Sequence, residues 1–221
     1  MKKTAVTIGM ITVISVLLLA PLLLRVKIDC GSQYGECPQE VKTDIAEIKA
    51  GSLFSTRRAL TKYLGRSFLV SEYSLQFKLP DILRADLVIK KPVFALEDPL
   101  NQKFNLIDNG GKVLAVTDFS TLPVVTDNDG LKNVGEDLDS NKLFALKIVQ
   151  GVFQMFQVAR GKIEGEALVI DLTPELKVIF PLQGDSDLLL GSLRLIVSKI
   201  QNESPGKYTQ IDLRYKNPVL R

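Results

Sequence analysis

The spacing of apolar residues changes several times along this chain, and the first change is the largest. Two lysines precede Thr4–Leu24, a run of twenty-one residues without a charge. A helix of that length spans about 31 Å, close to the hydrocarbon thickness of a bilayer. The small-residue cleavage site of a signal peptide does not follow the run. The pattern therefore predicts an uncleaved transmembrane helix over 4–24, with residues 1–3 as a cytoplasmic tail and 25–221 outside the cytoplasm.

The next seventy residues have the spacing of a small α/β domain. Val26–Ile28 is a short apolar segment typical of a strand. Apolar residues then recur every three or four positions after Pro38 and again after Ser55, which can cap a helix. A period of two follows on both sides of a turn at Pro80. This pattern predicts the order strand, helix, helix, strand, strand over 25–91.

From residue 92 onward the pattern predicts a mixed β-sheet domain with two packed helices. Seven short extended segments are expected, at Val93–Leu96, Phe104–Ile107, Val113–Val116, Leu122–Val125, Ala167–Leu172, Lys177–Phe180 and Tyr208–Tyr215. The apolar positions of the two helices are Leu146, Val149, Phe153 and Phe156, then Leu189, Leu193, Ile196 and Ile200. The predicted fold class is therefore α+β, with a transmembrane helix, a β-α-α-β-β domain and a mixed β domain over 92–221.

The charge balance argues against one class of partner. The chain has 28 Lys and Arg and 25 Asp and Glu, for a net charge of +3. Two of those lysines precede the apolar run, so residues 25–221 carry a net charge of only +1. A nucleic-acid-binding domain usually has a much stronger basic excess. We therefore expect no nucleic-acid partner.

Cys30 and Cys37 are the only cysteines, with six residues between them. In an oxidising compartment this spacing is typical of a local structural disulfide. A redox-active pair would more often have two intervening residues, and a zinc site would need further ligands. We therefore expect a structural disulfide.

Candidate catalytic and metal-binding residues are few. The absence of histidine excludes His-based triads and the commonest zinc sites, and no phosphate-binding glycine motif is present. The carboxylate pairs Glu164 with Glu166 and Asp185 with Asp187 border turns, where solvated charges are the commoner reading. The run 127–130 lacks the downstream glutamate of a calcium loop. The sequence predicts no enzyme, no cofactor, no metal and no small-molecule substrate.

The alternation over Tyr208–Tyr215 predicts a strand whose edge could accept a partner strand through its main chain. Ile211 and Leu213 fall on the face expected to join the core. Arg214 can form a bidentate salt bridge with a partner carboxylate, and tyrosine at position 215 is a typical interface hot spot. The alternative is that Arg214 is simply an exposed charge.

Short motifs follow one another in a fixed order along the chain. They are Leu79-Pro80, Leu83, Leu87, Lys91-Pro92, Ala95-Leu96, Phe104–Asp108 with Gly111 and Val113, Leu122-Pro123 and Ile211–Tyr215. With the apolar run and the chain length, this series resembles the FtsQ/DivIB family of bacterial cell-division proteins. The β-α-α-β-β order resembles the POTRA domain of that family. The cysteine pair and the very short cytoplasmic tail depart from the best-known members.

The resemblance implies a non-enzymatic divisome scaffold that links FtsB/DivIC-type and FtsL-type proteins during septum formation. It implies a single-pass protein of the bacterial inner membrane at the division septum, with a POTRA domain over 25–91 and a β domain over 92–221. It also implies that Arg214 and Tyr215 contact the FtsB-type partner, bound by strand addition at the C-terminal edge. Two alternatives stay open: a POTRA-bearing secretion or membrane-assembly factor, and a membrane-anchored cell-wall enzyme.

Overall fold

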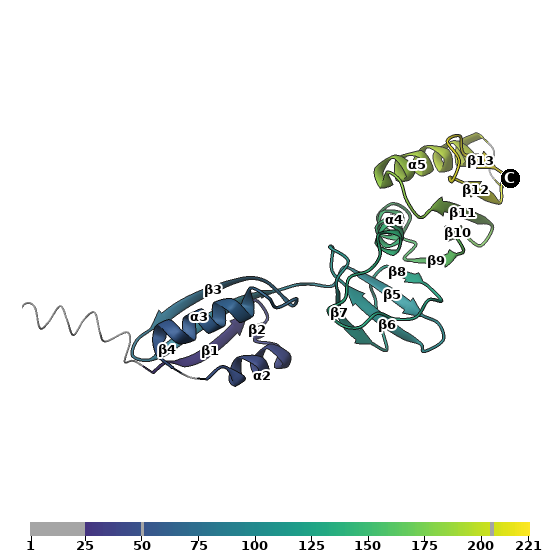
Figure 1. The fold of residues 1–221 in the computed structure, drawn as a ribbon. Helices are drawn as coiled ribbons and strands as arrows, with labels where there is room; N and C mark the ends of the chain where they lie inside the picture. The colour runs from purple at the N-terminus through teal and green to yellow at the C-terminus, as the bar shows by residue number, and fades with distance from the viewer. Residues whose placement is uncertain (1–24, 50, 204–205) are drawn as a thin grey trace, which may run out of the picture. The chain divides into compact units, whose positions relative to one another are not determined.

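The chain folds into two compact units, which Figure 1 shows in purple to blue and in teal to yellow. The computed structural model describes residues 25–49, 51–203 and 206–221. The first unit extends to Lys90, and the second runs from Lys91 to Arg221. The division falls one residue before the predicted boundary. Each unit has its own hydrophobic core.

The first unit is a four-stranded sheet with two helices. Its elements are β1 (Lys27–Ser32), β2 (Gly35–Glu36), α2 (Gln39–Glu47), α3 (Leu53–Leu64), β3 (Val70–Lys78) and β4 (Ile82–Ile89). The sheet order is β2-β1-β4-β3, with β1 parallel to β4 and the other pairs antiparallel. Apolar residues of both helices and of β4 form one core, including Val41, Leu60 and Leu83. The short strand β2 is an element that the sequence pattern did not predict.

The start of α3 differs from the prediction. Ser52, rather than Ser55, caps the helix, and its Oγ accepts the Ser55 N–H at 3.4 Å. Ser52 has the extended backbone of a cap residue, whereas Ser55 lies within the first helical turn. Two serines spaced by three residues cannot be distinguished as caps from sequence alone.

The second unit contains a nine-stranded sheet and two helices. Its elements are β5 (Phe94–Asp98), β6 (Lys103–Ile107), β7 (Val113–Thr117), β8 (Val124–Thr126), α4 (Ser140–Phe156), β9 (Arg160–Glu164), β10 (Ala167–Thr173), β11 (Leu176–Pro181), α5 (Ser186–Glu203), β12 (Gln210–Asp212) and β13 (Val219–Leu220). The sheet order is β13-β12-β11-β10-β9-β8-β5-β6-β7. The pairs β5-β8, β8-β9 and β11-β12 are parallel. Each helix therefore connects two neighbouring parallel strands, α4 from β8 to β9 and α5 from β11 to β12.

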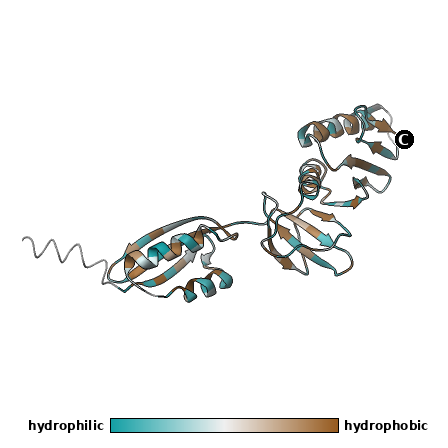
Figure 2. Ribbon diagram, in the orientation of Figure 1, coloured by the Kyte–Doolittle hydropathy of each residue, from teal (hydrophilic) through white to brown (hydrophobic). Residues whose placement is uncertain are grey.

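Both helices of the second unit share one core with the sheet. Figure 2 shows brown, apolar positions recurring along α4, α5 and the strands. Leu146, Val149 and Leu193 are fully buried there, as their spacing predicted. The helices approach closely at Gly151, where a Cβ atom would collide with the side chain of Leu190. A glycine in the middle of α4 thus makes room for a leucine of α5.

The predicted fold class and location need correction. Sheet dominates the α+β fold, and within residues 25–49, 51–203 and 206–221 no helix has both the length and the apolar character needed to cross a bilayer. This finding contradicts the predicted fold class with a transmembrane helix and the predicted single-pass membrane location. The run 4–24, on which both were based, lies outside the described residues.

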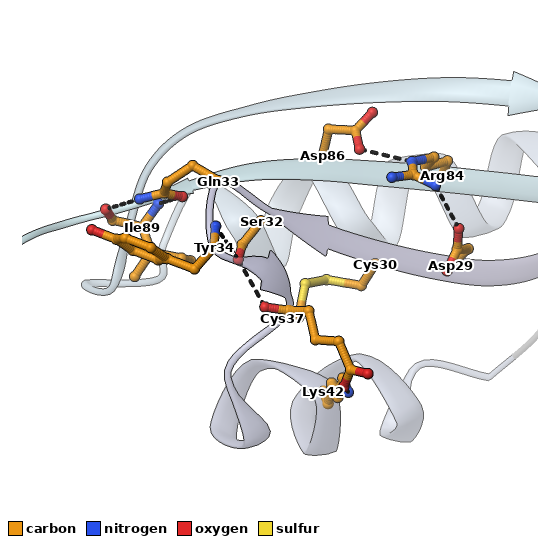
Figure 3. The surroundings of a disulfide bond; sticks show 11 residues. Asp29, Cys30, Ser32, Gln33, Tyr34, Cys37, Lys42, Arg84, Asp86 and Ile89 are labelled. Atoms are coloured by element: carbon orange, nitrogen blue, oxygen red, sulfur yellow. Dashed lines mark hydrogen bonds and ion pairs between the residues drawn. A yellow bond between two sulfur atoms is a disulfide. The ribbon is translucent and has the colours of Figure 1, made fainter.

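The predicted disulfide is confirmed. Cys30 of β1 is bonded to Cys37, which follows β2 and lies two residues before α2, and their Cα atoms are 5.8 Å apart (Figure 3). The bond closes the hairpin formed by β1 and β2, and Cys37 is buried in the core of the first unit. Around it, Ser32 Oγ donates a hydrogen bond to the Glu36 carbonyl at 2.7 Å, and Lys42 forms an ion pair with Glu36. The disulfide therefore fastens the start of α2 to the sheet.

We expect replacement of both cysteines by alanine to destabilise the first unit selectively. Closing a loop of this length contributes about 2.5 kcal/mol in the chain-entropy model. Hydrogen exchange of β1, β2 and α2 should accelerate, because their opening becomes easier. Peptides from β10 and β11 in the same sample serve as the internal control and should be unchanged. Unaltered exchange in β1 and α2 would contradict a stabilising role for the bond.

Candidate functional site

The motif with the most specific resemblance, Ile211–Tyr215, lies beside one edge of the nine-stranded sheet. Ile211 and Leu213 are fully or almost fully buried in the core of the second unit, as predicted. The Leu213 N–H donates to the Ile179 carbonyl at 2.8 Å, which continues the parallel pairing of β12 with β11. These contacts hold the start of the motif rigidly, while residues 214–218 are exposed.

The predicted open edge at Tyr208–Tyr215 is corrected by the strand pairing. Only Gln210–Asp212 forms a strand, and β13 pairs antiparallel with it on the side away from β11. Gln210 and Arg221 exchange two main-chain hydrogen bonds of 3.0 Å, and the Thr209 N–H donates to the Arg221 carbonyl at 2.7 Å. The edge of the sheet is therefore β13, a strand of two residues.

Arg214 is engaged within the chain. Its Nε and its backbone N–H donate to Oδ1 of Asp212 at 3.0 and 3.1 Å, and its Nη2 donates to Oδ2 at 2.7 Å. Asp212 is fully buried, whereas 43% of the Arg214 side chain is exposed. The hydrogen bond from Arg214 lowers the pKa of Asp212, and it outweighs burial, which would raise it. The bidentate partner predicted on another protein is thus already supplied by Asp212.

Tyr215 is the exposed aromatic residue of the motif. More than half of its surface, 56%, is accessible, and the Arg214 guanidinium carbon lies 5.9 Å from its ring centroid. That separation is within the range of a cation–π contact. The two predicted site residues therefore lie side by side next to the sheet edge, with Arg214 fixed by Asp212 and Tyr215 open to solvent.

A second polar cluster lies at the start of α4. Lys142 Nζ contacts Oδ2 of Asp127 at 2.5 Å and Oδ2 of Asp129 at 3.1 Å, and the Asp139 carboxylate lies 3.9 Å away. Only 11% of the Lys142 side chain and 6% of the Asp127 side chain are exposed. These residues line a cleft of about 510 Å³. The solvated turn predicted for 127–130 is therefore corrected at Asp127, which is buried.

The charge state of this cluster indicates a structural role. Burial alone would lower the pKa of Lys142, but hydrogen bonds and charge from Asp127 and Asp129 outweigh it, and the pKa is raised. A catalytic lysine needs a lowered pKa to act as a nucleophile or base. Within the part of the chain that the structure describes, no group of His, Cys, Asp and Glu side chains is arranged to hold a metal. Lys142 instead ties the loop after β8 to α4.

In each carboxylate pair considered as an acid–base candidate, one member has a structural partner. Oδ1 of Asp185 accepts the N–H groups of Asp187 and Leu188 at 2.9 and 3.1 Å and so caps the start of α5. Glu164 forms an ion pair of 3.1 Å with Lys162, its neighbour on the same face of β9.

Two of these interactions were absent from the sequence predictions. The burial of Asp212 has no local signal, because a strand of three residues is too short to show which positions are covered. Lys142 did have a signal, since it precedes Leu146 and Val149 by four and seven residues on the buried face of α4. A lysine at such a position needs a carboxylate partner, and the nearby run of aspartates supplies it.

Neither a protein-family model nor a curated protein matches this chain.

Replacing Lys142 with methionine should destabilise the second unit by about 3 kcal/mol, because the buried Asp127 carboxylate would lose its counter-charge. Lys147→Met is the matched control, since Lys147 is exposed on the same helix, and it should change the unfolding free energy little. Urea unfolding followed by circular dichroism measures both variants. Equal stability of the two would show that the Asp127 pair contributes nothing.

The Asp212–Arg214 pair should give stability a specific pH dependence. The folded-state pKa of Asp212 lies below its unfolded value, so its contribution is complete above the unfolded pKa of about 3.9 and is lost as pH falls through the folded pKa. Asp212→Asn should lower the unfolding free energy at pH 7 by about 2 kcal/mol. The gap between the two proteins should narrow below pH 4. A gap that stays constant down to pH 2 would contradict this role.

Proposed function

We propose that this protein is a non-enzymatic scaffold of bacterial cell division that links FtsB/DivIC-type and FtsL-type proteins during septum formation. The ordered series of motifs that resembles the FtsQ/DivIB family supports this function. The division of the chain into a β-α-α-β-β unit with one extra short strand and a larger sheet-rich unit is compatible with it.

The observation that carries the proposal is the sheet edge beside Tyr215 and Arg214. A sheet edge can bind an extended partner segment through main-chain hydrogen bonds, while neighbouring side chains select its sequence. The most specific motif of the resemblance ends beside this edge, with an exposed tyrosine and a half-exposed arginine. Asp212 of β12 holds Arg214 in place. The partner is proposed to pair with this end of the sheet.

The carboxyl groups whose pKa is shifted belong to hydrogen bonds within the fold. Among the described residues, four carboxyl groups have a shifted pKa, and in each a hydrogen bond from a neighbouring side chain lowers it. The pairs are Glu36 with Lys42, Asp98 with Asn101, Glu136 with Asn133 and Asp212 with Arg214. These groups are held in the charged form by structural partners.

Tyr215→Ala should weaken capture of a purified FtsB/DivIC-type protein from the same organism by about tenfold or more, as expected for loss of a hot-spot side chain. Tyr34→Ala is the matched control, because Tyr34 is exposed to a similar degree (63%) but lies in the first unit. A substitution at Tyr215 is a clearer test than one at Arg214. Replacing Arg214 with glutamate would place a second negative charge against buried Asp212 and so disturb the fold as well as the site. Binding is measured by biolayer interferometry, with circular dichroism to verify folding.

Two outcomes of this measurement would count against the proposal. Undiminished capture by folded Tyr215→Ala would remove Tyr215 from the site. Failure of the wild-type chain to capture any FtsB/DivIC-type or FtsL-type protein would overturn the scaffold function itself.

A further inference from the structure

The strand that closes the C-terminal edge of the sheet is weakly integrated. β13 has two residues, both only half-buried, and the exposed segment 214–218 connects it to β12. By contrast, Ile211, Asp212 and Leu213 are fully or almost fully buried. Short elements with few buried contacts open more readily than the buried elements of a core. β13 is therefore the element of this edge that can separate most easily from the rest of the sheet.

The hydrogen-bond pattern leaves little for a partner to bind outside β13. Because Arg221 and Gln210 exchange both of their main-chain bonds, the preceding residue, Leu220, directs its N–H and C=O away from β12. Pro218 has no N–H to donate. A partner strand added outside β13 would thus find one residue with a free donor and acceptor. By contrast, the N–H of Thr209 and both the N–H and the C=O of Gln210 are bonded to Arg221, and a strand that replaces β13 could bind these three groups.

The side chain of Leu220 defines what can occupy this position. Leu220 lies opposite Ile211 in the antiparallel register and packs against the core of the second unit, as Tyr208 does. A segment that replaces β13 must therefore present an aliphatic residue opposite Ile211, or the core there would be left exposed. Val219 lies opposite Asp212.

We propose that β13 is a replaceable substitute for the partner strand, and that the partner binds by exchange. The partner segment displaces residues 217–221, pairs antiparallel with β12, and places an aliphatic side chain in the position of Leu220. This inference depends on the proposed scaffold function for the identity of the partner. It adds the mode of binding and the required sequence feature of the bound segment.

Two variants test the exchange in opposite directions. A chain ending at Asn217 lacks β13, and it should bind an FtsB/DivIC-type protein about tenfold more tightly than the wild type, since no strand has to be displaced. Ile211→Cys with Leu220→Cys should lock β13 in place when oxidised. Cβ atoms of such directly opposed residues are about 4.5 Å apart, near the separation of a disulfide. The locked form should bind about tenfold more weakly or not at all.

The controls are internal. Adding reductant should restore binding by the locked variant. The reduced variant also serves as the control for the packing that is lost when Ile211 is replaced by cysteine. Wild-type protein treated with the same reductant controls for opening of the Cys30–Cys37 bond. As a measurement independent of the partner, a labelled peptide of residues 216–221 should bind the chain that ends at Asn217, and the same peptide with Leu220→Asp should not.

The outcomes separate the two proposals. If the wild type captures the partner but the locked form does so equally well, exchange is wrong while the scaffold function stands. Unchanged affinity after removal of β13 likewise overturns exchange. If the wild type captures no partner, the scaffold function fails, and the peptide measurement still decides whether the β12 edge accepts a replacement strand. Failure of the peptide to bind the folded, shortened chain would then overturn the inference.

Discussion

Every β-sheet has two edges with unpaired main-chain groups, and the way this chain covers them organises much of its structure. At one edge of each sheet the covering strand has only two residues: β2 lies outside β1, and β13 lies outside β12. The two coverings are fastened differently. The disulfide closes the hairpin of β1 and β2, whereas β13 is held by main-chain hydrogen bonds and the partial burial of Leu220. One edge is closed covalently, and the other can be reopened.

The same contrast explains the arrangement of the motif beside β12. A surface that exchanges one strand for another needs a fixed boundary, because the incoming segment must find its register. Buried Asp212 supplies that boundary by holding the Arg214 guanidinium and backbone N–H. Arg214 is thereby prepositioned next to Tyr215 rather than free to search for a carboxylate. A charge-assisted contact with a partner would have to share Arg214 with Asp212, whereas the Tyr215 ring is open to solvent.

The sequence pattern predicted the long elements and the positions in them that face the core. Spacing predicted Leu146 and Val149 of α4 and Leu193 and Ile200 of α5 in the core, together with Ile211 and Leu213. It placed Phe153 on the buried face of α4, where the structure buries Val152 instead. The strands β2 and β13 could not be predicted, since two residues have no period and pair only after the surrounding sheet has formed. β9 was also missed, because Gly161 interrupts its alternation where the strand passes under Val149 and Leu168. The partners of Lys142 and Arg214 depend on the same tertiary positions.

The close approach of α4 and α5 bears on the order in which the second unit matures during synthesis. A glycine inside a helix costs about 1 kcal/mol relative to alanine, so α4 is a weaker helix by itself than its length suggests. Leu190, which fills the space beside Gly151, is made thirty-nine residues later. A growing chain that has not yet reached α5 contains α4 and the segments of β5–β11 but lacks the leucine that fills this space. The segment that forms β12 is made later still.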